Sequence, residues 1–358
     1  MKETASFTIG YSQILNEQSR PVAQLPEFAQ DFNQLIAMYR SMLLTRTFDK
    51  KAIALQRTGQ LGTYPSSLGQ EAISVALATA MHKDDVLFPY YREYGAQFLR
   101  GVDMSEMLLY WGGDERGMNY KNQAHDFPIC VPIASHGPHA VGVAYAIKHR
   151  KEQRVAVYVL GDGATSKGDF YESINAAGTW QLPMIIVVNN NQWAISTPRS
   201  EQTACATIAQ KAIAGGIAGE QVDGNDIIAL RARFEEALNK ARSGGGATLI
   251  EALTYRLCDH TTADDASRYR NDEEVEQAWK IEPIARLRNY LSSENHWNPD
   301  KEETLQQECS QLVEAAVKRY LNTPAQAPET MFDFMFETPT NELLQQQKQV
   351  AERNKQNA

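Results

Sequence analysis

Two apolar runs dominate the hydrophobic pattern of the chain, and each stops abruptly at small or polar residues. Residues 155–160 read Val-Ala-Val-Tyr-Val-Leu, and residues 184–188 read Met-Ile-Ile-Val-Val. Their length and β-branched content are typical of buried parallel strands. The segment that begins at Gly168, between the two runs, carries apolar residues on one helical face. The pattern therefore predicts a right-handed β-α-β unit, whose two strand ends lie at one edge of a sheet.

The remaining pattern extends this unit into an α/β fold with a mostly parallel central sheet flanked by helices. Periodicity and chain punctuation predict the following further elements: helices at 28–57 and 71–81, a short strand at 85–89, a small-residue helix within 132–148, a charged surface helix at 234–242 and a core strand at 247–253. We expect an N-terminal arm at 1–27 that wraps a neighbour, an α/β body at 28–281, and a helical C-terminal extension at 282–358 packed on that body.

Small and polar residues at the two strand ends are the strongest chemical signal in the chain. Gly161-Asp162-Gly163 ends the first run and Asn189-Asn190-Asn191 ends the second. Glycines allow a sharp turn close to a ligand, and open α/β sheets bind ligands at the carboxyl ends of their strands. Either half alone is more often an ordinary turn or a polar loop, but the pair predicts a site for Mg²⁺ and a diphosphate. A dinucleotide fingerprint is excluded here, because Thr165 and Ser166 follow where its third glycine belongs.

Composition narrows the partners and the compartment. A net charge of −9 argues against a nucleic-acid partner. The 4 cysteines lie far apart without a Cys-x-x-Cys motif, which argues against a disulfide framework or a zinc site and favours a reducing compartment. No apolar stretch is long enough to span a bilayer, and the first residues lack the features of a signal or transit peptide. We therefore expect a cytoplasmic protein without a membrane partner.

From Gly59 to about Pro339 the chain resembles the α subunit of the heterotetrameric thiamin-dependent 2-oxoacid dehydrogenases, the decarboxylating component of those complexes. Within this family the bacterial pyruvate dehydrogenase α subunits are the most similar group. The motifs that carry the resemblance follow one another along most of the chain: residues 61–72 (LGTYPSSLGQEA), 91–93 (YRE), 161–198, 221–226 (QVDGND), 254–256 (TYR) and 259–265 (DHTTADD). The resemblance implies a thiamin diphosphate-binding fold, with thiamin diphosphate and Mg²⁺ as cofactors.

The resemblance also assigns residues to the diphosphate. Tyr91 and Arg92 match a Tyr-Arg pair that binds it, for which the planar guanidinium is well suited. From local sequence alone Arg92 is as readily explained by a surface ion pair. The N–H groups of Gly163 and Ala164 are implied to face the diphosphate, and the main chain of Ile133 is implied to contact the aminopyrimidine region.

The implied Mg²⁺ ligands are the side-chain oxygens of Asp162 and Asn191 and the backbone carbonyl of Trp193. Many relatives have Tyr or Phe at the position of Trp193, a change that leaves a main-chain ligand intact. His260 matches a loop histidine that contacts the cofactor and acts catalytically in reductive acylation of the lipoyl group, although a solvated loop histidine would look the same. Such proton transfer requires a nearly neutral pKa. His136 stands where relatives usually carry Gln.

The reaction and partners implied by the resemblance require more than this chain. In the family, two α and two β chains form the component, and the glutamate that activates the cofactor comes from the β subunit. The implied activity is decarboxylation of pyruvate and reductive acetylation of the lipoyl domain of the acyltransferase, whose subunit-binding domain is a further partner. Three alternatives remain: a branched-chain 2-oxoacid dehydrogenase α subunit, an acetoin dehydrogenase α subunit, and a non-catalytic assembly subunit that binds cofactor.

Overall fold

The protein is described by a computed structural model that covers residues 1–123 and 125–357. Ala124 and Ala358, which belong to the predicted body and C-terminal extension, lie outside the described residues. Six parallel strands of the described chain form one sheet, in the spatial order β1 (Gly10–Ser12), β7 (Ala218–Asp223), β8 (Thr248–Leu253), β4 (Met184–Asn190), β3 (Ala156–Gly161) and β2 (Val86–Phe88). The predicted α/β class with a parallel central sheet is confirmed.

Alternation along the central strands divides the core into two layers. Val157 and Val159 of β3 face one layer, and Tyr158 and Leu160 face the other. The first layer contains buried residues of α1 (Phe32–Arg57), α2 (Glu71–Ala80), α9 (Ile227–Arg242) and α11 (Pro283–Ser293). The second contains buried residues of α5 (His136–Arg150), α6 (Gly168–Thr179) and α8 (Lys211–Ala214). Because both faces are covered there, β3 is apolar up to Gly161 and β4 up to Asn189, as the sequence indicated.

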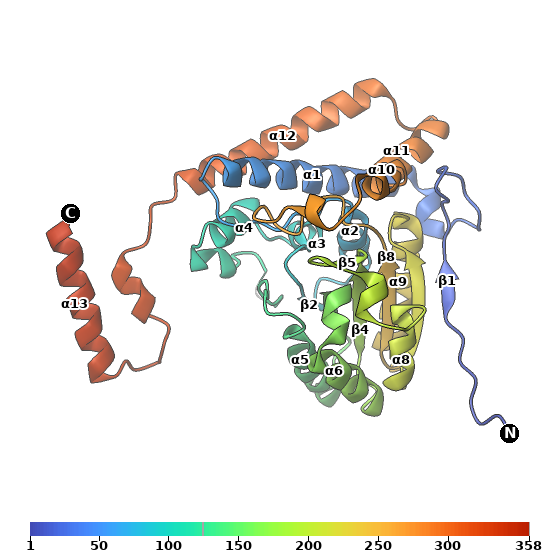
Figure 1. Ribbon diagram of the computed structural model, residues 1–358, viewed down its shortest axis with the longest axis horizontal. Coiled ribbons are helices and arrows are strands. Elements are labelled where there is room, and N and C mark those ends of the chain that lie inside the picture. Colours follow the sequence, from blue (N-terminus) through green and yellow to red (C-terminus); the bar gives the residue numbers. More distant parts are fainter. Residues whose placement is uncertain (124, 358) are drawn as a thin grey trace.

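A third buried cluster lies beside the sheet. It joins the second half of α1 to α3 (Tyr94–Leu99), α4 (Met104–Trp111) and α12 (Pro299–Leu321). Figure 1 shows α12 lying along α1, whereas the final helix α13 (Asn341–Asn357) stands apart from the body with the preceding 3-10 helix at Pro328–Phe332. The remaining strands and α-helices of the described residues are short: the antiparallel pair β5 (Trp193–Ala194) and β6 (Thr197–Pro198), then α7 (Arg199–Gln202) and α10 (Asp272–Lys280).

The N-terminal segment adds an edge strand to the chain's own sheet. β1 pairs in parallel with β7, and Leu15 just beyond it is buried in the first core layer. The division of the chain into arm, body and extension stays a prediction. No helix in the described ranges is both long and apolar enough to cross a membrane.

The predicted surface helix at 234–242 was wrong in its extent and its burial. α9 begins at Ile227, seven residues earlier than 234, and its buried face includes Leu230, Phe234 and Leu238. The first turn reads Ile-Ile-Ala-Leu, a continuous apolar run without helical period, so the sequence pattern concealed the start of the helix. Its N-cap is Asp226, whose side chain accepts from the N–H groups of Ile228 and Ala229.

Candidate active site

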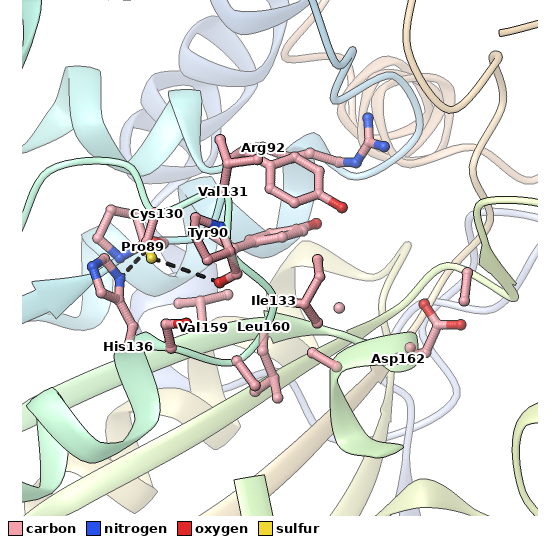
Figure 2. A pocket seen from close by; sticks show the side chains of 18 of the residues that line it. Pro89, Tyr90, Arg92, Cys130, Val131, Ile133, His136, Val159, Leu160 and Asp162 are labelled. Carbon is pink, nitrogen blue, oxygen red and sulfur yellow. Dashed lines mark hydrogen bonds between the residues drawn. The ribbon is translucent and has the colours of Figure 1, made fainter. Parts of the chain in front are cut away.

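One cavity lies at the carboxyl ends of β3 and β4 and gathers every residue that the sequence assigned to cofactor, metal or catalysis. Its volume is about 210 Å³. Figure 2 shows Arg92, Ile133 and Asp162 around it, brought together from three separate segments of the chain. The predicted site residues that line it are Tyr91, Arg92, Ile133, Asp162, Gly163, Ala164, Asn191, Trp193 and His260. Parallel strands explain this convergence, because their carboxyl ends meet at one edge.

Asp162 occupies the turn where β3 ends. It begins a 3-10 helix at Asp162–Ser166, and α6 follows immediately. Gly163 must remain small, because a Cβ there would come within 2.6 Å of the Ala194 Cβ. The Asp162 carboxylate is buried and accepts a hydrogen bond from Gln202 Nε2 at 2.6 Å. Burial raises the pKa of Asp162 while its hydrogen bonds oppose that rise, so a cation at this position would compensate the buried charge.

The end of β4 delivers amide and carbonyl oxygens beside Asp162. The Asn191 side chain is buried and donates from Nδ2 to Gln70 Oε1 at 3.0 Å, while its Oδ1 accepts from the Trp193 backbone N–H at 3.2 Å. Across the described residues there is no group of three or more His, Cys, Asp and Glu side chains that could hold a metal. A cation at this cavity would therefore depend on one carboxylate together with amide and main-chain oxygens, a donor set that fits Mg²⁺.

Two guanidinium groups meet at His260. Arg92 donates to the His260 carbonyl oxygen at 2.7 Å, and its Nη2 lies 3.2 Å from His260 Nδ1. Arg256 Nη1 lies 3.3 Å from the same nitrogen. Burial and these two cations lower the pKa of His260 to about 3. The proposed proton transfer requires a nearly neutral pKa, and burial and the two arginines hold the pKa of His260 below that range in the chain without cofactor.

The same cluster suits an anion. Arg92 and Arg256 are both buried, and burial together with repulsion from Arg92 lowers the pKa of Arg256. Asp264 approaches this cluster and accepts from the His260 backbone N–H at 2.8 Å. A diphosphate would relieve the repulsion between the two guanidinium groups, so the residues present fit the predicted cofactor group.

The part of the cavity wall formed by the loop before α5 is mostly apolar. Val131 and Ile133 are 46% and 44% exposed and line the cavity from the loop before α5. His136, at the start of that helix, is buried and joins its Nδ1 to the Pro89 carbonyl oxygen at 2.9 Å (Figure 2). Burial lowers the pKa of His136 to about 4, so this imidazole is neutral and donates from Nδ1. The bond ties the loop before α5 to the segment that carries Tyr91.

Three non-glycine residues with positive φ lie at or beside the cavity. Ala134 and Ile195, which line it, have φ values of 65° and 56°, and the neighbouring Gln192 has a φ of 72°. Positive φ is unusual for any residue other than glycine and rare for a β-branched one such as Ile195. Strained backbone of this kind is typical of ligand-binding sites.

Sequence reasoning missed three polar residues of the site. Arg256 was part of a recognised motif but had no assigned role, and Gln70 and Gln202 were not singled out. Each acts through a partner side chain: Gln202 on Asp162 and Gln70 on Asn191, which are distant in sequence, and Arg256 on His260 four residues later. The single local signal was that Arg256 closely follows the strand at 247–253 and therefore lies at the same sheet edge.

Comparisons with known proteins agree with this geometry. A family model described as "Dehydrogenase E1 component" matches residues 39–329, and that family depends on thiamin diphosphate. The pyruvate dehydrogenase E1 component subunit alpha of Staphylococcus aureus is 38% identical over 337 residues, which cover 93% of this chain and 90% of the relative. The 3-methyl-2-oxobutanoate dehydrogenase subunit alpha of Mycobacterium tuberculosis is 45% identical over 266 residues, 74% of this chain and 72% of the relative. Matches of this extent, together with a cavity that gathers the predicted residues, show that the chain belongs to the dehydrogenase E1 component family.

Proposed function

We propose that this chain is the α subunit of a pyruvate dehydrogenase E1 component, which binds thiamin diphosphate and Mg²⁺ and works together with a β subunit. The observation that carries the proposal is the convergence of all nine predicted site residues on one cavity at the sheet edge. The relative from Staphylococcus aureus, similar along 93% of the chain, supports pyruvate as the substrate.

In this proposal the cavity holds the metal through Asp162, Asn191 and the carbonyl oxygen of Trp193. Burial of Asp162 makes it sensitive to a neighbouring cation, because its charge has little solvent screening. When bound, thiamin diphosphate supplies the electron sink that makes decarboxylation of a 2-oxoacid possible. The chain's own contribution is to bind the diphosphate, orient it and exclude water.

The diphosphate would be held by positive and N–H groups on both sides of the cavity. Arg92 supplies guanidinium donors, and Arg256, which does not line the cavity, adds positive charge behind His260. Tyr91 packs beside Arg92, whose Cζ lies 5.1 Å from its ring centroid. The backbone N–H groups of Gly163 and Ala164 lie on the turn after β3, near the start of α6. Ile133 would contact the aminopyrimidine region through its main chain.

His260 is proposed as the residue that handles a proton during transfer to the lipoyl group. A guanidinium can only donate hydrogen bonds, so Nδ1, which faces Arg92 at 3.2 Å and Arg256 at 3.3 Å, must act as an acceptor. The neutral imidazole therefore holds its proton at Nε2. That atom is the one that can donate a proton or hydrogen bond to a reacting group.

The partners in this proposal are two β chains for two α chains, and the lipoyl and subunit-binding domains of the acyltransferase. The assembly would transfer the acyl group to a lipoyl disulfide in the cytoplasm. Apolar side chains at the cavity support a missing partner surface: Val131 and Ile195 are 46% and 55% exposed although both line it.

A branched-chain 2-oxoacid dehydrogenase is the second candidate, favoured by the relative from Mycobacterium tuberculosis at 45% identity over a shorter span. The two candidates separate in one assay. The chain is produced with the β subunit that copurifies with it, and kcat/KM is measured for pyruvate and for 3-methyl-2-oxobutanoate with an artificial electron acceptor. The proposal expects the larger value for pyruvate, and a preference for the branched substrate would replace it with the second candidate.

A further inference from the structure

Gln70 lies outside the cavity but touches two of the residues that line it. It sits immediately before α2 and is 2% exposed. Its Oε1 accepts from the Tyr90 hydroxyl at 3.1 Å and from Asn191 Nδ2 at 3.0 Å. One amide oxygen therefore connects the end of β4 with the segment that carries Tyr90, on the two sides of the proposed metal and diphosphate site.

The orientation of the Asn191 amide follows from its two contacts. The Trp193 backbone N–H, which can only donate, lies 3.2 Å from Asn191 Oδ1. The nitrogen end of the same amide must then face Gln70, which must present an acceptor. If the amide of Asn191 were reversed, its NH₂ group would face the Trp193 N–H and its oxygen would leave the position from which it can bind a cation. Gln70 thus favours the orientation in which the side-chain oxygen of Asn191 can bind the metal.

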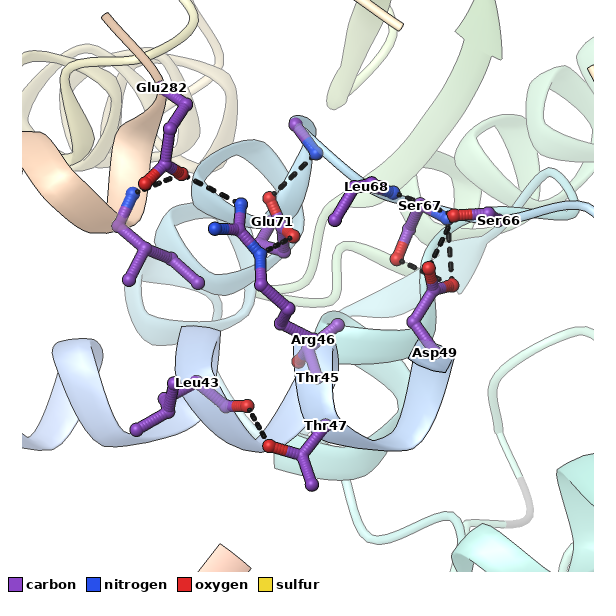
Figure 3. A network of polar contacts seen from close by, with 12 residues as sticks. Leu43, Thr45, Arg46, Thr47, Asp49, Ser66, Ser67, Leu68, Glu71 and Glu282 are labelled. Carbon is purple, nitrogen blue, oxygen red and sulfur yellow. Dashed lines mark hydrogen bonds and ion pairs between the residues drawn. The ribbon is translucent and has the colours of Figure 1, made fainter. Parts of the chain in front are cut away.

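The loop that carries Gln70 is fixed from both ends. On the α1 side, Asp49 accepts from the Ser67 N–H at 2.9 Å, and Arg46 pairs with Glu71 at 2.7 Å (Figure 3). Beyond β8, the Thr254 hydroxyl donates to the Gly69 carbonyl oxygen at 2.8 Å.

Close backbone packing at Gly69 further restricts the loop that carries Gln70. Its φ is +90°, and a Cβ would come within 2.6 Å of the Tyr255 carbonyl oxygen. Gln70 is therefore held by buried polar contacts and close backbone packing, and it can impose an orientation on Asn191.

We infer that Gln70 is a positioning residue that holds the Asn191 amide oxygen toward the metal. The inference rests on the proposed function, because Asn191 is a ligand only in that site. The hydrogen bond from Asn191 Nδ2 uses only the acceptor oxygen of Gln70, because Gln70 Nε2 has no hydrogen-bond partner among the residues described. A side chain that offers only an acceptor should therefore replace Gln70, whereas an apolar side chain of similar size should not.

The test measures the Mg²⁺ concentration at which thiamin diphosphate binding is half-saturated, by calorimetry on the α/β complex. Gln70→Leu leaves Asn191 Nδ2 without an acceptor, and its Mg²⁺ requirement is expected to rise by about 10- to 100-fold, the usual effect of removing a partner of a metal ligand. Gln70→Glu offers a carboxyl oxygen in either protonation state and is expected to stay within about threefold of the unchanged protein.

Two further variants separate the possible outcomes. Gln97→Leu makes the same change at another glutamine that is 2% exposed but does not line the cavity. Its Nε2 donates to the Tyr120 hydroxyl at 3.0 Å. Gln97→Leu should lower the thermal unfolding temperature without changing the Mg²⁺ requirement. Asp162→Ala should abolish Mg²⁺-dependent binding, and if it does not, the proposed metal site itself fails.

If Asp162→Ala loses binding, three results would overturn the role of Gln70. The first is a Gln70→Leu complex with an unchanged Mg²⁺ requirement. The second is an equal loss in Gln70→Leu and Gln70→Glu, which would mean that packing rather than the acceptor matters. The third is an equal loss in Gln97→Leu, which would mean that general destabilisation explains the effect.

Discussion

Burial and two arginines keep His260 neutral in the chain without cofactor. Arg92 and Arg256 lie 3.2 and 3.3 Å from its Nδ1, and together with burial they lower its pKa to about 3. An anionic diphosphate next to these guanidinium groups would act in the opposite direction, because negative charge stabilises the imidazolium. The pKa that matters for proton transfer is therefore set jointly by the chain and by the group it binds, and the sequence motif around His260 did not contain that information.

Replacing His260 should separate two partial reactions. His260→Ala removes the proton held at Nε2, so lipoyl-domain acetylation by the α/β complex should fall by about 10²- to 10⁴-fold, the usual contribution of a general acid or base. Decarboxylation measured with an artificial electron acceptor, which bypasses the lipoyl group, should fall much less, and cofactor affinity should change little. Thr261→Ala, at the next position of the same loop, is the control. Small and equal losses in both assays would show that His260 only orders its loop.

Glu93 predicts a measurable dependence of stability on pH. Glu93 is 1% exposed, neither of its carboxyl oxygens has a hydrogen-bond partner among the described residues, and burial raises its pKa from 4.5 to about 8. Below pH 4.5 the folded and unfolded states are both protonated. Between pH 4.5 and about 8 the unfolded state releases the proton and the folded state keeps it, so stability falls as pH rises.

Glu93→Gln, which cannot titrate, should remove that decline. The variant should gain unfolding free energy relative to the unchanged protein between pH 4.5 and 8, with a constant difference above that range. Thermal unfolding at a series of pH values measures this difference. Identical pH profiles for the two proteins would mean that Glu93 is ionised in the folded state.

At the scale of elements, the segments with a clear hydrophobic period were the ones that the sequence predicted. β3, α6 and β4 were all predicted, because strands buried on both faces and an amphipathic helix leave clear patterns. β7, which the pattern did not identify as a strand, carries the polar residues Glu220, Gln221 and Asp223 and lies between the short edge strand β1 and β8. The site was predictable to the same extent: residues at strand ends were found, and those that act through distant hydrogen bonds, such as Gln70, were not.

Asp226 connects α9 to the N-terminal segment, so the stability of the fold should be sensitive to its substitution. Its carboxylate caps α9 and also accepts from the backbone N–H groups of Ile14 and Leu15 at 2.6 and 2.7 Å. Asp226→Ala leaves all of these donors without a partner in a buried place, and the unfolding free energy should fall by about 3 kcal/mol or more. Chymotryptic cleavage after Tyr11, which is 53% exposed, should accelerate as the N-terminal segment detaches.

The control is Asp31→Ala, which removes the exposed N-cap of α1, where Asp31 accepts from the Asn33 N–H at 3.0 Å. It should lower the unfolding free energy by about 1 kcal/mol and leave chymotryptic cleavage after Tyr11 unchanged. Equal effects of the two substitutions would show that Asp226 contributes only a helix cap and does not hold the N-terminal segment.

At the scale of the whole molecule, we propose that the chain supplies only part of a catalytic site. Asp162 is the only carboxylate among the described residues that line the cavity, and the proposal commits it to the metal. Among the described residues that line the cavity, no other carboxylate is then available to accept a proton from the aminopyrimidine region. Ile133 and Ile195, which also line the cavity, are 44% and 55% exposed. Both features are those of a site completed by another subunit.

The chain alone should therefore bind cofactor weakly and turn over no substrate. Purified without a β subunit, with its absence verified by mass spectrometry, it should release no CO₂ from pyruvate above the uncatalysed rate in the presence of thiamin diphosphate and Mg²⁺. Adding the β subunit should restore turnover in proportion to the complex formed, measured by size-exclusion chromatography. A β chain whose cavity-facing glutamate is replaced by Gln is the matched control, because it should assemble with the α chain without restoring the rate. Turnover by the verified α chain alone, at a rate near that of the complex, would show that the cavity is catalytically complete and would contradict the shared site.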